Sequence, residues 1–473
     1  MTDTALPIKN PSVTLYAFHL CQELGQLRQD ADQLWQHCAQ LSEPFGIPEL
    51  KSFPEKLKSS RSQTAITSRY LELLPDNRCL TYTLPLHIPG SALTVKVYPV
   101  KIHDTYAVDI TLYYQNVTVP VGQFSRLNPQ GCLLASTIQA SLGQTLVLYG
   151  EPVGTPEEDS KLADACVDAF FQGSDQKPQF MASGQLFGSP IFAYDNGKEK
   201  PTEQCHLLVC LNRHPETVNL EQKTYRSFFN LLCCRSKILF AYHEARWCYR
   251  QTRELYGQLE QEVKGFKELP REREIRLEQL KQKLTQMPSQ TFDYAVYLRD
   301  IEDHKTAIAF GAAKPIATNA ENYDYWLKKI RESSLKDDNI EFLEYFLNQR
   351  TKLFQNQIQT NLNYLKPGQQ LFDQMLGSIR GIVETEQAQQ EKRLERWIAS
   401  VGIGLAVSGI SSQTAAKPVE SIITQLYPKQ SLDCPKAGVT PCLTYSFVFV
   451  LFHVGVGAIA ALIVYPIIHR LSK

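Results

Sequence analysis

The sequence carries no excess of charge of either sign: 49 Lys and Arg residues balance 49 Asp and Glu residues. Proteins that bind nucleic acids by neutralising phosphates carry clusters of basic residues and a positive balance. Hydrophobic residues make up 43% of the chain and charged residues 21%, a composition that excludes a disordered or collagen-like protein. We therefore expect a folded protein without a nucleic-acid partner.

The short motifs of common enzyme classes are also missing. The chain has no G-x-x-x-x-G-K-[ST], G-x-G-x-x-G, H-E-x-x-H or G-x-S-x-G sequence. The glycine-containing loops Gly150–Gly154 and Gly184–Gly188 have room for a small ligand, but such turns need none. We expect no catalytic residues, no metal site and no cofactor, and an enzyme is the least favoured of the functions considered.

Metal-binding and redox spacings are absent among the twelve cysteines, since no C-x-x-C occurs. Ten of them lie between Cys21 and Cys248, where we expect reduced and mostly buried thiols. Met1–Pro11 is polar and has no basic region followed by an apolar core, so we expect no signal peptide.

A change from helical to strand periodicity marks the first part of the chain. Residues 12–41 place apolar residues near a 3.6-residue period and predict a helix, followed by a loop over 44–64. Apolar residues then alternate with polar ones over 80–88, 93–97 and 108–112, which predicts half-buried strands, with a turn at His103-Asp104. We expect helices at 131–142 and 156–172 and strands at 145–149, 180–194 and 206–211. Residues 66–215 are thus predicted to form an α/β domain with a mixed sheet, after an N-terminal helix and linker at 1–65.

Long helices are predicted beyond residue 216. A helical pattern covers 217–268, and a coiled-coil-like seam of Leu277, Leu280, Leu284 and Met287 follows Pro270. Lys366-Pro367-Gly368 is predicted to break the next helix and to form an antiparallel hairpin. The helical region is therefore bounded at 216–368, and a stalk helix follows at 369–396.

The most apolar part of the chain lies at its C-terminal end. Tyr445–Ile468 contains 24 residues without a formal charge, enough to cross about 30 Å of hydrocarbon. The shorter run Trp397–Ser412 is predicted as a first span, so that 397–473 forms a transmembrane hairpin. Basic residues before the first span and after the second favour a position of both ends inside. We expect a multi-pass protein of the cell (inner) membrane, with 1–396 and the C-terminus cytoplasmic and the loop 417–444 outside.

Two features of the predicted hairpin are candidate sites. Ser400, Gly404, Ser408 and Ser412 repeat every four residues and place small side chains on one helix face. Such a face either lines a narrow pore or lets helices pack closely. Cys434 and Cys442 lie in the exterior loop with Pro435, Gly438 and Pro441 between them, and we expect a disulfide there.

The order of an α/β domain, long antiparallel helices, a stalk helix and two C-terminal spans resembles the CorA-like metal-ion transporter superfamily over most of residues 66–473. The resemblance implies a pentamer with the first span, 397–412, lining the pore. The family's Gly-Met-Asn signature is absent, and Gly409-Ile410-Ser411-Ser412 stands in its place. Selectivity for magnesium is therefore not implied. The architecture is also similar to divergent bacterial membrane effectors of defence systems, whose cytosolic domain answers to a ligand or partner.

We therefore expect a CorA-like homo-oligomer in the lipid bilayer, whose cytosolic α/β domain senses a small-molecule ligand or a protein and controls the hairpin, as an ion channel or as a membrane effector. The alternative is a non-conducting membrane-tethered scaffold that recruits a partner through the mixed-charge helices at 246–287.

Overall fold

A computed structural model describes residues 6–23, 26–61, 70–74, 79–85, 92–309 and 317–387, together with Val450, Leu451, Gly455 and Ile459. The chain divides into two compact units. Unit 1 combines Met1–Glu23, Leu27–Cys248 and Asp300–Leu362, and unit 2 combines Leu24–Gln26, Tyr249–Arg299 and Asn363–Lys473.

Unit 1 is built on a ten-stranded sheet with the order β10-β11-β12-β9-β1-β7-β6-β4, to which β5 is added at β6 and β8 at β1. Strands β9 and β12 pair in parallel, and β1 pairs antiparallel with both β7 and β9. The strands are β1 (Pro7–Leu20), β4 (Tyr70–Glu72), β5 (Leu80–Pro85), β6 (Ala92–Ile102), β7 (Thr105–Tyr114), β8 (Thr118–Pro120), β9 (Gly143–Pro152), β10 (Gln179–Leu186), β11 (Ser189–Asp195) and β12 (Cys205–Leu211). A separate pair joins β2 (Gln22–Glu23) and β3 (Gln26–Leu27). The prediction of an α/β domain with a mixed sheet is confirmed.

The helix predicted over 12–41 is wrong for its first half. Pro7–Leu20 is the strand β1 near the middle of the sheet, and only α1 (Gln33–Gln40) is helical. Val13, Leu15 and Ala17 are fully buried on one face of β1, and Phe18 is fully buried on the other. Because both faces are covered, apolar residues do not alternate along the strand, and their spacing imitates a helical period.

The strands that follow β4 agree better with the predictions made from the sequence. Strands β5, β6 and β7 lie where alternation placed them, and His103 turns β6 into β7 with a positive φ of 54°. The predicted loop at 44–64 instead contains the 3-10 helix η2 (Pro48–Ser52) and α2 (Phe53–Arg61). The helix expected at 131–142 shortens to α3 (Ala135–Ile138), whereas that at 156–172 corresponds to α4 (Asp159–Phe170), preceded by η5 (Pro156–Glu158).

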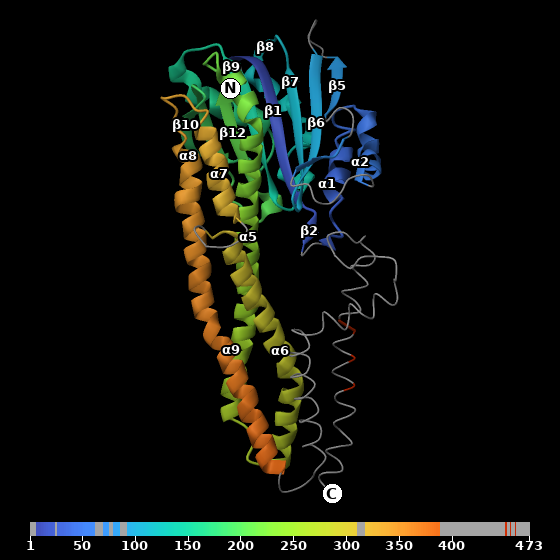
Figure 1. Cartoon of the computed structure of the whole chain (residues 1–473), viewed down its shortest axis with the longest axis vertical. Coiled ribbons are helices and arrows are strands. Elements are labelled where there is room, and N and C mark those ends of the chain that lie inside the picture. Colours follow the sequence, from blue (N-terminus) through green and yellow to red (C-terminus); the bar gives the residue numbers. More distant parts are fainter. Residues whose placement is uncertain are drawn as a thin grey trace. The chain divides into compact units, whose positions relative to one another are not determined.

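Different helices cover the two faces of the sheet. The larger core joins strand residues to α1, α2 and α4, and it includes Trp35, Phe53 and Cys166. On the opposite face, Phe229 and Leu232 of α5 (Thr217–Lys267) pack on β1, β6 and β7. Figure 1 shows α5 in green beside the strands. The sheet is therefore buried on both sides.

The helical part consists of α5, α6 (Arg273–Ala307), α7 (Asn319–Arg331), α8 (Glu341–Tyr345), the π-helix η7 (Phe346–Thr351) and α9 (Lys352–Gln387). Within unit 2, Tyr256 of α5 packs on Tyr364 of α9 with ring centroids 5.7 Å apart, and Tyr294 of α6 packs on Phe372 at 5.3 Å. In the predicted seam of α6, Leu280 and Met287 are buried. The prediction of long helices is confirmed.

The predicted break at Lys366-Pro367-Gly368 is wrong, because α9 passes through it without interruption. Proline inside a helix costs about 3 kcal/mol, so packing has to offset this cost. Gly368 allows that packing, because a Cβ there would collide with the Tyr294 hydroxyl oxygen and with a ring carbon of Tyr256. The boundary at residue 368 falls inside one helix.

Most of the predicted membrane hairpin, including all of Trp397–Ser412, lies outside the described residues. Val450, Leu451, Gly455 and Ile459 of the predicted second span are helical. Among the helices that the structure describes, none combines the length and apolarity needed to cross a bilayer.

Candidate functional site

The six residues predicted as sites cannot be located in the fold. Ser400, Gly404, Ser408 and Ser412, and the cysteines Cys434 and Cys442, all lie outside the described residues. Unit 1 contains buried polar and charged residues, among them Asp109, His206 and Arg235.

Side chains from the segment after β12 contact both glycine-containing loops. Arg213 binds Asp159 through two hydrogen bonds, of 2.8 and 2.5 Å, and donates to the carbonyl oxygens of Gly154 and Thr155 at 2.9 Å. In the other loop, the His214 ring lies against Gly188, whose φ is +79°. These contacts give both loops a structural role.

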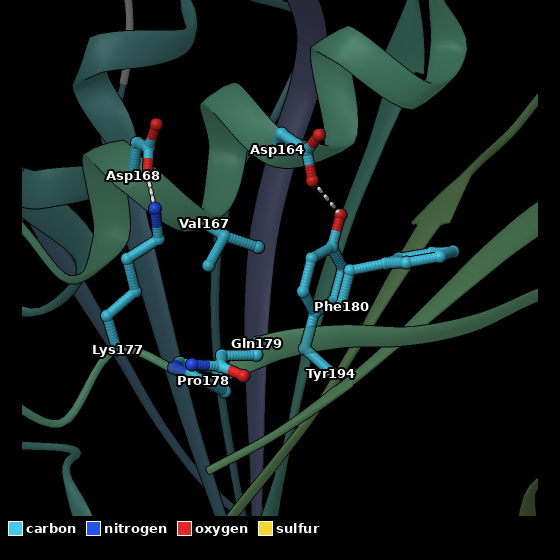
Figure 2. A pocket seen from close by; sticks show the side chains of 8 residues that line it. All are labelled: Asp164, Val167, Asp168, Lys177, Pro178, Gln179, Phe180 and Tyr194. Carbon is cyan, nitrogen blue, oxygen red and sulfur yellow. Dashed lines mark hydrogen bonds and ion pairs between the residues drawn. The ribbon is translucent and has the colours of Figure 1, made fainter.

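A polar pocket of about 540 Å³ opens between α4 and the start of β10. In Figure 2, the Tyr194 hydroxyl points to Asp164, to which it donates at 2.7 Å, and Lys177 forms an ion pair with Asp168. Phe180 packs edge-on against the ring of Tyr194, with centroids 5.7 Å apart. Burial and the neighbouring Asp164 raise the pKa of Tyr194, so this phenol is a neutral donor at physiological pH.

The residue next to this pocket faces the other side of the sheet. Asp195 follows Tyr194 in β11, and its carboxylate accepts a hydrogen bond of 2.9 Å from Arg235 of α5. Only about a tenth of each side chain is exposed: 10% for Asp195 and 9% for Arg235. Removal of one partner of such a buried ion pair destabilises the fold, because the other charge then stays buried without a counter-charge.

Arg235 joins three parts of unit 1. We call Thr145, Asp195, His206, Arg235 and Phe346 the Arg235 cluster. The guanidinium lies 5.1 Å from the centre of the Phe346 ring, at the first residue of η7. His206 of β12 shares a hydrogen bond of 3.1 Å with Thr145 of β9, and burial together with the charge of Arg235 lowers its pKa. The cluster thus connects the sheet, α5 and the π-helical turn before α9.

A second buried polar group lies under the beginning of α5. We call Tyr16, Asp109, Thr111, Glu221 and Tyr225 the Asp109 cluster. The Asp109 carboxylate accepts hydrogen bonds of 2.7 Å from the Tyr225 hydroxyl and from the Thr111 hydroxyl. Burial outweighs these bonds and raises the pKa of Asp109 to about 6, and burial raises that of Glu221 to about 7.

Charge and burial act together on the remaining member of the cluster. Burial and the nearby Asp109 and Glu221 raise the pKa of Tyr16, which stays protonated. The carboxyl groups of Asp109 and Glu221, whose pKa values lie near neutral pH, are therefore located where α5 packs on the sheet.

The cysteines of the described residues are placed as predicted. Nine of the ten are buried, and none forms a disulfide. Burial raises the pKa of Cys38 and Cys132 to about 12, which keeps these thiols protonated and unreactive. Within the described ranges, no three His, Cys, Asp or Glu side chains are placed to hold a metal ion.

Sequence patterns contain one signal for these buried groups and do not predict the others. Asp109 was placed on the polar face of a half-buried strand, but β7 is covered on both faces and Asp109 is only 8% exposed. A charged residue inside the apolar run Val108–Leu112 was the available sign. His206 begins a similar run at His206–Leu211.

Comparisons with protein-family models, with curated proteins and with solved structures found no match to this chain.

Proposed function

We propose that this chain is a homo-oligomeric, CorA-like membrane protein whose α/β unit binds a ligand or partner and controls a C-terminal transmembrane hairpin that passes ions. The observation that carries the proposal is the continuity of α9. This helix follows η7 directly and extends without a break from Lys352 to Gln387. Residues 388–396 then lead to the apolar run Trp397–Ser412.

The Arg235 cluster supplies the connection that such control needs. A ligand that shifts β11 changes the position of Asp195, and with it the Arg235 guanidinium that lies over Phe346. A π-helical turn holds an extra residue relative to an α-helix and is often found at functional sites. Conversion of η7 to α-helix would rotate α9 about its own axis by about 100°. In this mechanism the shift reaches the pore helix through the stalk.

Charge distribution supports the membrane orientation. Lys392, Arg393 and Arg396 precede the first apolar run, and Arg470 and Lys473 follow the second. We therefore place both ends in the cytoplasm and the loop 417–444 outside the inner membrane.

Thiol labelling tests this orientation. In a variant without Cys434 and Cys442, the thiol introduced by Thr440→Cys should react with an impermeant maleimide on intact cells. The thiol introduced by Ser472→Cys should react only after permeabilisation. Reaction of the latter on intact cells contradicts the orientation. In the native loop, mass spectrometry after alkylation without reductant should find Cys434 bonded to Cys442, and alkylation of both thiols contradicts the disulfide.

Ion flux through reconstituted vesicles tests the pore. Gly404→Leu adds bulk to the proposed lining and should abolish flux while the oligomer stays intact. Gly402→Leu is the matched control, because two residues along a helix turn the side chain by about 200° and away from that face. Loss of the oligomer in Gly404→Leu would instead assign the small-residue face to helix packing.

The alternative function is the non-conducting scaffold that recruits its partner through residues 246–287. Wild-type oligomers that pass no ions under any ligand tried would favour it. Part of the charge in this stretch is used inside unit 2, since Lys283 pairs with Glu262 and Arg276 pairs with Glu386. This internal pairing favours the channel over the scaffold.

A further inference from the structure

Among the residues that the structure describes, β10 is the last strand on its side of the sheet, and only part of its outer edge is covered. Near its C-terminal end, the Gln185 N–H donates to the carbonyl oxygen of Asn339 at 2.8 Å. Asp338 holds this crossing segment in place, because its carboxylate accepts from the backbone N–H groups of Phe187 and Gly188 at 2.7 Å. Gln179–Ser183 lies beyond this cover, and all of its side chains except the half-buried Ala182 are exposed.

The backbone of this outer edge is oriented to accept another strand. Along an antiparallel strand, alternate residues direct both their N–H and their C=O to the same side. Gln185 directs its N–H away from β11, where its register partner is Pro190, which has no N–H to donate. Ser183 lies two residues earlier and therefore also directs its donor and acceptor outward.

Apolar side chains accompany these backbone groups. Phe180 is 54% exposed and Met181 is 47% exposed. The register with β11 shifts between Phe180 and Ala182, so that Met181 is the extra residue of a bulge. No residue of Gln179–Leu186 is charged, and edge strands without charges pair readily with extended segments.

An acidic surface lies beside the edge. Asp164 and Asp168 of α4 line the same pocket as Gln179 and Phe180 (Figure 2). Between Glu157 and Lys177 the chain has six acidic residues and two basic ones, and Arg213 pairs with Asp159, which leaves a net charge of −3. A segment that pairs with β10 therefore meets negative charge on the α4 side of the sheet.

We propose that the edge of β10 binds an extended, basic segment of a partner protein by strand addition. A second copy of this chain fits less well, because antiparallel pairing of two β10 strands would bring both acidic α4 helices to the same face of the joined sheet. The basic segment matches both features: its backbone pairs with the edge at Ser183, and its Lys or Arg side chains reach Asp164 and Asp168. The inference concerns unit 1 alone, so it stands or falls separately from the membrane proposal.

Selection from a phage-displayed random peptide library on the full-length protein tests the proposal. The enriched peptides should alternate apolar residues and carry Lys or Arg, and their binding should weaken with added salt. Ser183→Pro removes the outward N–H and leaves the hydrogen bonds to β11 in place. It should weaken binding of the enriched peptides by about tenfold or more, with the melting temperature little changed.

A second variant covers the case in which Ser183→Pro fails to fold. Met181→Lys adds a positive charge to an exposed position of the edge and should repel the same peptides. Gln222→Lys, at an exposed position of α5, is the matched control and should bind as the wild type does. The proposal is overturned if no peptide is enriched, if enriched peptides lack basic residues, or if they bind all variants equally. Self-association that Ser183→Pro abolishes would assign the edge to a second copy instead.

Discussion

Replacement of Asp109 by Asn should remove a specific part of the pH dependence of stability. The pKa of Asp109 rises from its ordinary 3.8 to about 6 in the folded protein, because the carboxyl is buried. The folded state therefore holds this proton more tightly than the unfolded state does. Such a group stabilises the fold fully below its unfolded pKa, and the contribution is lost as the pH rises through about 6.

The size of the effect follows from the two pKa values. A rise from 3.8 to about 6 corresponds to about 3 kcal/mol in favour of the protonated folded state. About 1 kcal/mol of this is lost between about pH 5 and pH 8. For Glu221, whose pKa rises from 4.5 to about 7, the loss over the same interval is about 2–3 kcal/mol.

The wild-type curve alone does not isolate these contributions. Burial lowers the pKa of His19 and His206, and their contributions to stability rise with pH as they lose the proton that the unfolded state still binds. The informative quantity is the difference between wild type and Asp109→Asn at each pH. Asn keeps the size of the side chain and an oxygen acceptor, but it does not titrate.

Hydrogen-exchange mass spectrometry of peptides from Thr105–Tyr114 measures the local opening free energy in the full-length protein. After correction for intrinsic exchange, the opening free energy of wild type minus that of Asp109→Asn should fall by about 1 kcal/mol from pH 5 to pH 8. Asp175→Asn, at an exposed loop position, serves as the control for loss of a surface carboxylate. A flat or rising difference for Asp109→Asn would refute the assignment of a buried, proton-binding carboxyl.

Two further predictions concern packing and buried charge. Gly368→Ala should destabilise α9 by about 1–3 kcal/mol, because the new Cβ would collide with Tyr294; Gly377→Ala, which has open space around it, should be neutral or stabilising by up to about 1 kcal/mol. Hydrogen exchange along α9 distinguishes these outcomes, and equal protection in both variants contradicts the packing argument. Arg235→Met should destabilise unit 1 by about 3–5 kcal/mol, since it leaves the Asp195 carboxylate buried without a counter-charge. Addition of Asp195→Asn should recover part of this loss in denaturant unfolding, and a double variant no more stable than the single one would contradict the reasoning.

Local sequence patterns predicted the secondary structure correctly where one face of an element is exposed or where a turn is short. Strand β5, the β6–β7 hairpin and α4 belong to this group. They were insufficient for β1, because burial of Val13 and Phe18 on opposite faces removes the alternation. They also failed at Pro367, where contacts from α5 and α6 decide the conformation and no local signal records them.

The candidate site was predicted least well, because its members are distant in the sequence. Tyr225 and Asp109 are separated by 116 positions, and Arg235 and Asp195 by 40. Asp109 and Arg235 each stand within an apolar stretch, but neither stretch indicates the distant residue with which it pairs. Their pairing depends on the position of α5 on the sheet, which no short-range pattern specifies.

The position of β1 also has a consequence for synthesis on the ribosome. Strand β1 is made before both of its long neighbours, since it lies between β7, which begins at Thr105, and β9, which begins at Gly143. Its two edges have no native partner until those segments have been translated, and β12 can complete the parallel pair only after residue 211 has been added. Domains fold as units during translation, and strands that wait for distant partners are exposed to wrong pairing. The nascent chain therefore has to shield Val13–Phe18 for more than a hundred residues of elongation, and this interval is where binding of a chaperone would matter most.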